Sequence, residues 1–490
     1  MERQPGSTGS TGKRANPLRG VNDIESMEVK NREKEGMKGK REKIFLASLG
    51  CPKNLVDSEN MLGLLNQAGF DFATTPAGAD VAVINTCGFL QSAVEEAIDT
   101  ILEMVELKKQ GVLERVIVTG CMVQRYGYKL KKEIPEVDAW LGTGGVGKIV
   151  DGVTDGSFGT SGQVYLIRPG RMADHAVPRI QTTPFYTTYL KIAEGCSHHC
   201  SYCMIPRLRG PYRSRALDSL LCEAEEMAAS GVKEINLVAQ DTTFFGTDRK
   251  SGITLEGLLE HLAAIEGLEW IRLLYCHPDR VSDRLLALVD SEEKICPYMD
   301  LPLQHVNPHI LESMGRPIHG ETPAALIKRI RSGSRGIYLR TTMMVGFPGE
   351  TDTAFEELSA FIEETRFHHL GVFAFSPEKG TAAYRLQPRV APAVAKQRVS
   401  LLMKRQKAVS RALNQELVGR LLPVLVEGAH EETPLLLSGR TEGMAPDVDG
   451  RVLINEGIGV PGQIMSVRIT EAHTYDLVGN IAENSGTEFF

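Results

Sequence analysis

From residue 43 onward, apolar runs alternate with amphipathic stretches. The first three runs are residues 43–51, 81–88 and 115–121. Of the two stretches between them, the first has helical spacing over residues 57–69 and a candidate N-cap at Asp57 or Ser58. The second begins at a capping box formed by Ser92 and Glu95. Apolar strands alternating with amphipathic helices predict an N-terminal parallel α/β domain, with helices covering the faces of the sheet.

Three cysteines, Cys51, Cys87 and Cys121, each lie where one of these strands ends. In a parallel sheet all strand carboxyl ends lie along one edge, so residues far apart in sequence meet there. A single buried cysteine is most simply a small hydrophobic residue. Three at equivalent positions on successive strands favour a site with three thiolate ligands.

The middle of the chain repeats the alternation over a longer span. Its apolar runs are residues 188–195, 234–241, 270–278, 298–305, 338–348 and 370–377. Helical patterns separate them, for example residues 217–231, 254–267 and 351–366. Six βα units predict a partial (βα)6 barrel. Its chemistry is expected at the carboxyl ends of the strands, as in the full eight-unit barrel.

The segment EGCSHHCSYC, residues 194–203, directly follows the first strand of this barrel. It contains Cys196, Cys200 and Cys203, one ligand fewer than a closed tetrahedral metal site needs. A four-iron cluster held by three cysteines leaves one iron without a protein ligand, and that iron can bind a small molecule. The alternative is a zinc site completed by His198 or His199. Both histidines lie inside the tight loop, where a side chain cannot easily turn back to ligate the ion that the cysteines hold.

After the barrel, a basic helical segment precedes the last part of the chain. Val399, Leu402, Met403 and Gln406 fall on one helical face, which we expect to pack on the barrel. Residues 415–480 then contain short β runs separated by Gly and Pro, which predict a small antiparallel β-barrel.

This last segment is acidic. Residues 415–480 contain ten Asp and Glu and four Arg, a net charge near −6. An acidic face suits a basic protein partner better than a phosphate backbone, so direct RNA binding is not expected. The alternative is an acidic domain whose charge serves solubility alone.

Length and composition agree with several domains. A chain of 490 residues with 42% hydrophobic residues is expected to form about three. No apolar run approaches the roughly 20 residues needed to cross a bilayer, and the N-terminus lacks a secretory segment, so we predict a cytoplasmic protein without membrane contact. Nine cysteines in a chain of this size favour reduced thiols that bind metal or catalyse. The first 40 or so residues are Gly, Ser and charge, which predict disorder.

Two weaker signals remain. The segment LGTGGVGKI, residues 141–149, fits part of a P-loop, but Ile149 stands where Ser or Thr is needed, so we interpret it as a turn. The three remaining cysteines, Cys222, Cys276 and Cys296, lie in or beside apolar patterns and are interpreted as core or incidental thiols.

The Cys-x3-Cys-x2-Cys spacing after a first barrel strand, with Tyr202 before the last cysteine, resembles the radical S-adenosylmethionine (SAM) enzymes. In that family a 4Fe-4S cluster binds SAM and cleaves it to a 5′-deoxyadenosyl radical. With the upstream cysteines, the resemblance narrows to the methylthiotransferases and covers residues 42–484. It implies a disordered extension (1–41), an N-terminal methylthiotransferase domain (42–155), a radical SAM core (182–412) and a terminal TRAM domain of the oligonucleotide-binding type (415–484).

Several segments resemble the branch of this family that modifies ribosomal protein S twelve. They include SLGCPKNLVDSE (48–59), the region 189–215, AQDTT (239–243) and MVGFPGET (344–351). The branch that modifies adenosine in transfer RNA usually has other residues after the first Gly-Cys, where this chain has Pro52 and Lys53. That transfer RNA branch is the alternative function, and a two-cluster electron carrier is a more remote one.

The resemblance implies a methylthio group added to the β-carbon of an aspartate in that ribosomal protein. It implies two 4Fe-4S clusters, one on Cys51, Cys87 and Cys121 and one, which binds SAM, on Cys196, Cys200 and Cys203. An electron donor such as flavodoxin or ferredoxin is expected, and no general base is named. The positions where related barrels contact SAM are Tyr202, Arg213, Arg215, Gln240 and Gly346. The Gly-Gly-Glu often found after the second strand reads Ala239, Gln240, Asp241 here.

Overall fold

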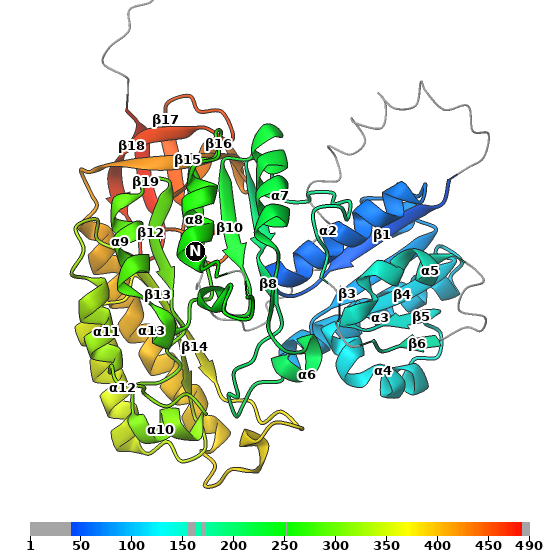
Figure 1. Cartoon of the computed structure of the whole chain (residues 1–490), viewed down its shortest axis with the longest axis horizontal. Coiled ribbons are helices and arrows are strands. Elements are labelled where there is room, and N and C mark those ends of the chain that lie inside the picture. The colour runs from blue at the N-terminus through cyan, green and yellow to red at the C-terminus, as the bar shows by residue number, and fades with distance from the viewer. Residues whose placement is uncertain (1–40, 155–162, 168–169, 171, 251, 483–490) are drawn as a thin grey trace, which may run out of the picture.

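The computed structural model describes residues 41–154, 163–167, 170, 172–250 and 252–482. The predicted extension over residues 1–41 therefore lies outside the described residues, except for residue 41. Three β-sheet units follow one another along the chain (Figure 1). They correspond to the predicted α/β class with a terminal β-barrel, whereas the exact domain limits stay predictions.

The N-terminal unit is a six-stranded sheet in the order β2-β1-β3-β4-β5-β6, and all its pairings are parallel. Its strands are β1 (Lys43–Ser48), β2 (Asp71–Phe72), β3 (Val81–Thr86), β4 (Arg115–Gly120), β5 (Ala139–Leu141) and β6 (Gln163–Tyr165). Its helices are α2 (Pro52–Gln67), α3 (Gln91–Lys109), α4 (Cys121–Glu133) and α5 (Ile149–Val153). Alternate strand residues pack against α3 and α4 on one face and against α2 and α5 on the other, as expected for a sheet buried on both sides.

Both predicted helix starts in this unit were wrong. Helix α2 begins at Pro52 with Cys51 as its N-cap, five residues before the predicted cap at Asp57. Pro is favoured at the first helical position because its missing N–H would have no partner there. Helix α3 begins after Leu90, without a side-chain cap, so the Ser92–Glu95 capping box is not formed. The turn predicted at residues 141–149 is present as the 3-10 helix η2 (Thr143–Lys148).

The central unit is an open barrel of six parallel strands in the order β14-β13-β12-β11-β10-β7. Its strands are β7 (Thr187–Lys191), β10 (Glu234–Val238), β11 (Trp270–Leu273), β12 (Ile295–Asp300), β13 (Tyr338–Val345) and β14 (His369–Ala374). Its longer helices are α7 (Leu217–Ala229), α8 (Leu255–Ala263), α9 (Asp283–Ser291), α11 (Pro323–Ile330), α12 (Asp352–Thr365) and α13 (Pro392–Gln415). These helices cover the outer face, and Leu402 of α13 is fully buried there, which confirms the predicted packing of that helix.

Short elements connect β7 to α7. They are β8 (Ala193–Glu194), α6 (Ile205–Arg209) and β9 (Arg213–Ser214), with β8 and β9 paired antiparallel. Besides η2, the 3-10 helices of the described chain are η1 (Pro76–Gly78), η3 (Thr242–Phe244), η4 (Pro278–Arg280) and η5 (Ala383–Arg385), and α10 (Pro308–Ser313) follows β12. The helix α6 lies beside α4 and η2, so this connection also contacts the N-terminal unit (Figure 1).

The C-terminal unit is a closed five-stranded barrel in the order β15-β16-β17-β19-β18. Its strands are β15 (Leu421–His430), β16 (Thr433–Thr441), β17 (Val452–Glu456), β18 (Ile464–Ala472) and β19 (Leu477–Ile481). The small β-barrel that we predicted is thus confirmed, and one of its pairings, β17 with β19, is parallel.

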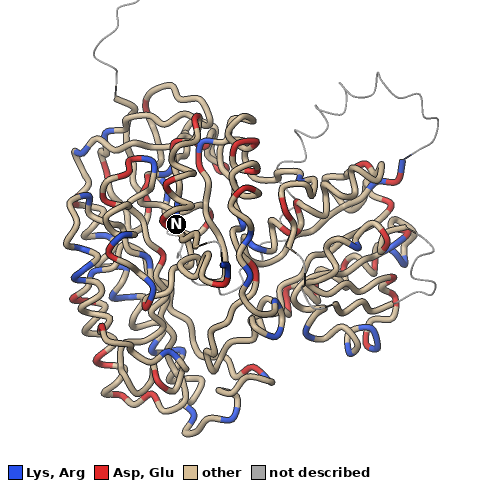
Figure 2. Tube along the Cα trace, in the orientation of Figure 1, with Lys and Arg blue, Asp and Glu red and all other residues tan. Residues whose placement is uncertain are grey.

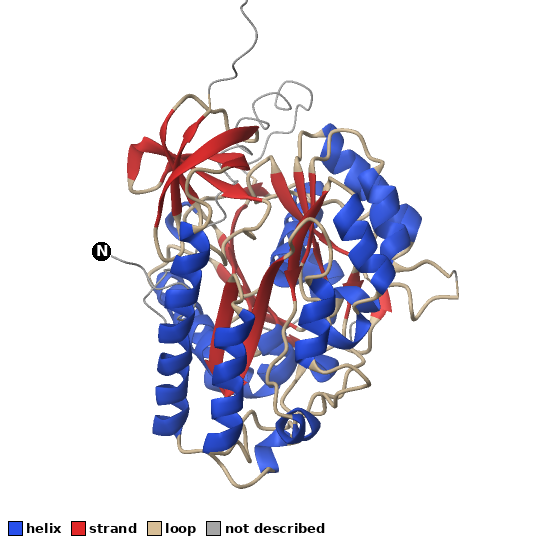
Figure 3. Cartoon of the chain, turned by 90° about the vertical axis from the view of Figure 1, so that its left-hand side faces the viewer, coloured by secondary structure: helices blue, strands red, loops and turns tan. Residues whose placement is uncertain are grey.

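The C-terminal barrel packs at the amino ends of the central strands (Figures 1 and 3). Glu234, the first residue of β10, accepts hydrogen bonds from Arg440 at 2.6 and 3.1 Å. His369, the first residue of β14, contacts the carbonyl oxygen of Gly443 at 2.8 Å. The barrel cysteines follow the carboxyl end of β7, so the C-terminal barrel and the cysteine loop lie at opposite edges of the central sheet.

This packing corrects part of the predicted acidic face. The side chain of Asp449 is 1% exposed, accepts a hydrogen bond from Tyr298 at 2.8 Å and forms an ion pair with Arg340. Its charge is therefore directed to the barrel and not to a partner. Lys and Arg are interspersed with Asp and Glu over the described trace (Figure 2). No helix among the described residues is long and apolar enough to cross a membrane.

Candidate active site

The first set of cysteines, Cys51, Cys87 and Cys121, lies at the carboxyl edge of the N-terminal sheet; we call it the N-terminal set. Cys51 caps α2, Cys87 follows β3, and Cys121 is the first residue of α4. Gly50 has φ +105°, and a β-carbon on it would lie 2.8 Å from the Cβ of Cys87. The glycine before Cys51 thus allows two of the cysteines to approach each other, as predicted from their positions at the strand ends.

The thiols of this set disfavour one another's ionisation. Burial, together with the neighbouring Cys51 and Cys121, raises the pKa of Cys87 to about 12. Burial also raises the pKa of Cys121, while the guanidinium of Arg209 opposes the shift by donating to its Sγ at 3.2 Å. Metal ligation requires thiolates, so a bound cationic group would offset the cost of ionising the buried Cys87 and Cys121.

The second set, Cys196, Cys200 and Cys203, lies in the loop between β8 and α6; we call it the barrel set. The loop is held by backbone hydrogen bonds from Cys196 N to Gly210 O and from Cys203 N to Cys200 O, both 3.1 Å. Burial raises the pKa of Cys203 to about 12, and Cys200 and Cys196 add to the shift. This set therefore has the same donor chemistry as the first and fits the same kind of group.

Two side chains approach Cys200. Tyr202, which the resemblance selects, is close enough to Cys200 for that thiol to affect its titration, and burial raises the pKa of its phenol well above its usual value. Arg316, which the sequence analysis missed, donates to Cys200 Sγ at 3.8 Å and to the carbonyl oxygen of Pro302 at 2.9 Å. It follows α10, more than 100 residues from the cysteine loop, and no local pattern marks it.

The histidines of the loop give no support to the zinc alternative. His198 Nε2 lies 2.7 Å from Asp241 Oδ2, and its ring stacks on that of His277 with a centroid distance of 4.1 Å. Within the described part of the chain, no three His, Cys, Asp or Glu side chains converge on a single metal-ion position. A zinc ion takes ligands at about 2.0–2.3 Å, whereas a four-iron cluster is larger and accepts thiolates at its corners.

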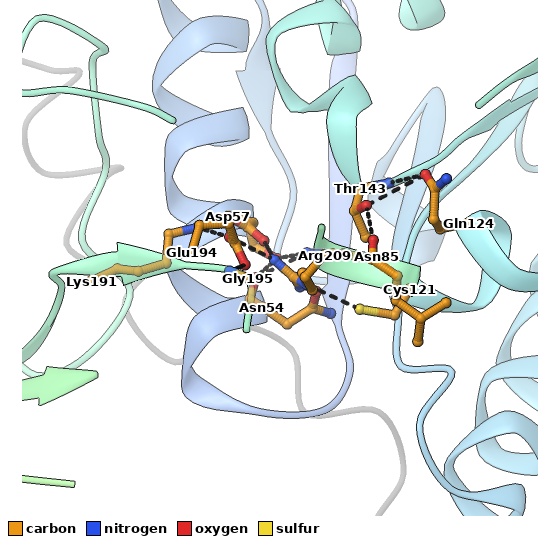
Figure 4. Close-up of polar contacts among 12 residues, drawn as sticks. Asn54, Asp57, Asn85, Cys121, Gln124, Thr143, Lys191, Glu194, Gly195 and Arg209 are labelled. Carbon is orange, nitrogen blue, oxygen red and sulfur yellow. Dashed lines mark hydrogen bonds and ion pairs between the residues drawn. The ribbon is translucent and has the colours of Figure 1, made fainter. Parts of the chain in front are cut away.

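A buried polar network connects Cys121 of the N-terminal set to Glu194, which lies two residues before Cys196 of the barrel set (Figure 4). Arg209 of α6 is 3% exposed and donates to Asp57 Oδ2 at 2.6 Å, Asn54 Oδ1 at 2.9 Å and Glu194 Oε2 at 3.0 Å. Lys191, at the end of β7, forms ion pairs with both Asp57 and Glu194. Because Asp57 belongs to α2 and Glu194 directly precedes the cysteine loop, the network fixes the N-terminal unit against the barrel.

Of the other predicted SAM contacts, Gln240 and Arg213 bond to residues of this network, whereas Arg215 lies away from the cysteines. Gln240 follows β10 and donates to Glu194 Oε1 at 3.0 Å, so it lies beside the network. Arg213 of β9 donates to the carbonyl oxygens of Pro211 and Arg209. Arg215 bonds instead to residues of β7 and α7 and forms an ion pair with Glu223 at 2.5 Å, so the structure does not bring it to the cysteines.

Gly346 follows β13, at the same edge as the barrel cysteines. Its N–H donates to Glu350, and a β-carbon on it would lie 2.5 Å from Cβ of Ala395 in α13. This glycine is therefore required by the packing of α13, and its N–H already has an acceptor within the chain.

Several buried polar atoms at the carboxyl ends of the central strands have no hydrogen-bond partner among the described residues. They are Arg213 Nε, Gln240 Oε1 and Asp300 Oδ1, together with His305 Nε2 and Glu350 Oε1, which lie 3.5 Å from each other. Buried polar atoms in folded proteins are normally hydrogen-bonded. Their concentration at one edge fits a polar cofactor such as SAM, whose amino, carboxylate and ribose groups can provide partners.

Three family models match the chain. Residues 43–142 match an uncharacterised protein family, UPF0004, residues 190–362 match the radical SAM superfamily, and residues 418–482 match the TRAM domain. A radical SAM methyltransferase, TsrM from Kitasatospora setae, solved with tryptophan and a SAM analogue, has a similar fold with a TM-score of 0.52. It is 13% identical and the match covers 76% of this chain and 89% of that one. Fold and cysteine loop together are those of a radical SAM enzyme.

Curated relatives narrow the class. A protein of Syntrophotalea carbinolica named ribosomal protein uS12 methylthiotransferase RimO is 48% identical over 92% of this chain and 99% of its own length. A protein of the same name from Syntrophobacter fumaroxidans is 49% identical over 90% of this chain and 98% of its own length. The chain belongs to the RimO family of methylthiotransferases.

Proposed function

We infer that this chain is a radical SAM methylthiotransferase that adds a methylthio group to the β-carbon of an aspartyl residue in ribosomal protein uS12. The observation that carries this conclusion is the similarity to proteins of that name at 48–49% identity over nearly their full length. The cysteine sets and the barrel provide the donor chemistry that such a reaction needs.

We propose that the barrel set holds the SAM-binding 4Fe-4S cluster and that the N-terminal set holds a second 4Fe-4S cluster. When bound, these groups and SAM supply a carbon radical at the barrel and sulfur at the other set, chemistry that no side chain provides. Neighbouring cysteines raise the pKa of Cys87 in one set and of Cys203 in the other, and each set has three cysteines, which supports open three-thiolate sites.

The side chains around these sets have positioning roles. Arg209 and Arg316 each donate to one cysteine and so stabilise its thiolate. The network of Lys191, Asp57 and Glu194 excludes water from the contact between the units, because all three side chains are less than a tenth exposed. No general base is required, since the hydrogen on an unactivated carbon is not acidic.

The partners follow from the substrate. Ribosomal protein uS12 is the protein substrate, and we propose an electron donor such as flavodoxin or ferredoxin as the source of the reducing electron. An enzyme that modifies a ribosomal protein works where ribosomes are assembled, which places it in the cytoplasm. The relatives do not favour the alternative on transfer RNA, and a pure electron carrier would not need the barrel.

Mass spectrometry of cells lacking the gene tests the substrate. We expect ribosomal protein uS12 to lose the mass increment of a methylthio group while digested transfer RNA is unchanged. Loss from transfer RNA with uS12 unchanged would transfer the assignment to the RNA-modifying branch.

Iron analysis tests the cluster ligands. After anaerobic reconstitution we expect about eight irons per chain. Changing Cys196, Cys200 and Cys203 to Ala should leave roughly half the iron and abolish formation of 5′-deoxyadenosine. Changing Cys51, Cys87 and Cys121 to Ala should also leave half the iron but preserve SAM cleavage. Cys222→Ala is the matched control, and 5′-deoxyadenosine from the first triple variant would contradict the assignment.

A further inference from the structure

Lys53 is a buried ammonium at the contact between the N-terminal unit and the barrel. It lies in the first turn of α2, two positions after Cys51, and is 7% exposed. Its Nζ lies 3.2 Å from the ring centroid of Tyr275, which follows β11. Helix α2 thus brings a positive charge from the N-terminal unit to the carboxyl ends of the barrel strands.

The polar surroundings of Lys53 differ from those of the other buried lysine of this contact. Lys191 forms ion pairs with two carboxylates, Asp57 and Glu194. Around Lys53, no Asp or Glu oxygen of the described residues lies within the 4.0 Å of an ion pair. Burying an ammonium without an anion costs free energy, so binding of an anion beside Lys53 would be favourable.

The carboxylate of Asp300, on which Lys53 acts electrostatically, is only partly engaged by other groups, because its Oδ1 has no hydrogen-bond partner among the described residues. Asp300, the last residue of β12, accepts the backbone N–H of Tyr275 at 3.0 Å and lies 3.8 Å from Arg340. A lysine ammonium has three donors, and among the described residues the ring of Tyr275 lies against Lys53 while Cys51 acts on it electrostatically. Donors of the ammonium therefore remain for a ligand oxygen.

We propose that Lys53 binds the side-chain carboxylate of the substrate aspartyl residue and thereby selects and positions it; this rests on the proposed function. The carboxylate carbon is bonded to the β-carbon, so an ion pair with Lys53 places the reacting carbon one bond from the anchored group. Because Lys53 follows Cys51 in the chain and Tyr275 borders the barrel, the anchored residue lies between the N-terminal and barrel sets.

A double-mutant cycle with the substrate tests this role. The reconstituted holoenzyme, as wild type and as Lys53→Met, is titrated with two labelled uS12 peptides, one with the target aspartate and one with asparagine in its place. We expect the Asp peptide to bind wild type at least tenfold more tightly than the Asn peptide. Lys53→Met should bind both peptides equally, with the affinity of wild type for the Asn peptide.

Further measurements separate the other roles that Lys53 could have. The affinity for SAM, which also carries a carboxylate, should be the same in wild type and Lys53→Met, and the iron content should be unchanged. Lys53→Arg should recover part of the preference for aspartate, and the exposed Lys148→Met is the matched control. Equal weakening of both peptides by Lys53→Met would overturn the proposal in favour of a packing role, and weaker SAM binding would assign the ammonium to the cofactor.

The proposed function can fail separately. If wild type neither binds nor modifies the Asp peptide or intact uS12, the substrate assignment is wrong and the role of Lys53 falls with it. If wild type modifies uS12 but the two substitutions are additive, the role of Lys53 alone is wrong.

Discussion

Replacing Arg209 by methionine is expected to destabilise the contact between α2 and the barrel. The guanidinium is 3% exposed and donates to Asp57, Asn54, Glu194 and Cys121. Methionine keeps much of the volume but removes the charge and every one of these hydrogen bonds. The variant therefore isolates the polar contribution of the side chain.

The expected magnitude follows from the charge balance. Arg209 and Lys191 face two carboxylates, Asp57 and Glu194, so the buried network is neutral without the thiols. Removing one cation leaves a net buried negative charge, which costs about 3–5 kcal/mol. Burial alone would raise the pKa of Glu194, but Arg209 and Lys191 hold it well below its usual range. In the variant that pKa should rise.

Urea unfolding of the purified protein under anaerobic conditions measures the loss. The chain has several units, so the midpoint and slope of the first transition are compared and not a single global free energy. The matched control is Arg366→Met, because Arg366 is 45% exposed and its ion pair with Glu416 lies at the surface. That control should cost less than about 1 kcal/mol.

A second substitution tests the charge argument itself. Adding Glu194→Gln to Arg209→Met removes the one uncompensated negative charge, so the double variant should be more stable than the sum of the single losses by at least about 1 kcal/mol. Equal losses in Arg209→Met and Arg366→Met, or additive effects of the two substitutions, would refute the reasoning.

Three further predictions concern single positions. Gly50→Ala should lower the iron bound after reconstitution by up to half, because the added β-carbon would overlap the side chain of Cys87. The control is Gly69→Ala, where φ is +92° but the space is open, and it should retain the iron. Equal loss of iron in both variants would point to backbone strain alone. Burial raises the pKa of Glu234, yet its two arginine partners lower it to about 2, so its contribution of about 3 kcal/mol should be present above pH 4.3 and lost as the pH falls towards 2. Acid unfolding of Glu234→Gln should be less steep over that range, and parallel curves would argue against this linkage. Leu402→Ala, at a fully buried position, should cost about 2–5 kcal/mol in urea unfolding, whereas the neighbouring Leu401→Ala, 39% exposed before the change, should cost little; similar losses would contradict the packing of α13.

The strands and the cysteine positions could be predicted from the sequence for one reason. A parallel strand buried on both faces is a continuous apolar run, and its end is marked by the first polar or small residue. Cys51, Cys87 and Cys121 follow such runs, and the topology of a parallel sheet alone brings them to one edge. No knowledge of side-chain contacts was needed.

The predicted start of α2 was wrong because the polar residues chosen as its N-cap make buried contacts inside the helix. Asp57 and Ser58 have the residue types of an N-cap, yet both lie inside α2 and are buried. Asp57 pairs with Lys191 and Arg209, and the hydroxyl of Ser58 accepts a hydrogen bond from Asn85 at 2.9 Å. A local rule assigns such residues to a helix end, whereas the contact between two units had placed them in its interior.

The same limit explains which site residues were missed. Arg209, Arg316 and Lys53 act on groups more than 80 residues away in the chain. Their partners depend on how α2, α6 and the segment after α10 dock at the barrel mouth, and this docking leaves no periodic pattern in the sequence. A long basic side chain in a loop or at a helix end is ordinarily a solvated residue, so nothing marked Arg209 or Arg316, and Lys53 was named only as a difference from the transfer RNA branch.

The position of the C-terminal barrel shows that binding the body of the substrate and recognising the residue to be modified are separate tasks. The central strands have four to eight residues, about 13–26 Å at 3.3 Å per residue, and they lie between the acidic barrel and the cysteine loop. Part of the acidity is also used internally, since Asp449 pairs with Arg340 and Glu427 with Arg440. The C-terminal barrel can therefore contact the body of a basic substrate, but it cannot recognise the residue that is modified. Selection of that residue has to come from side chains at the carboxyl ends of the strands, which is where Lys53 lies.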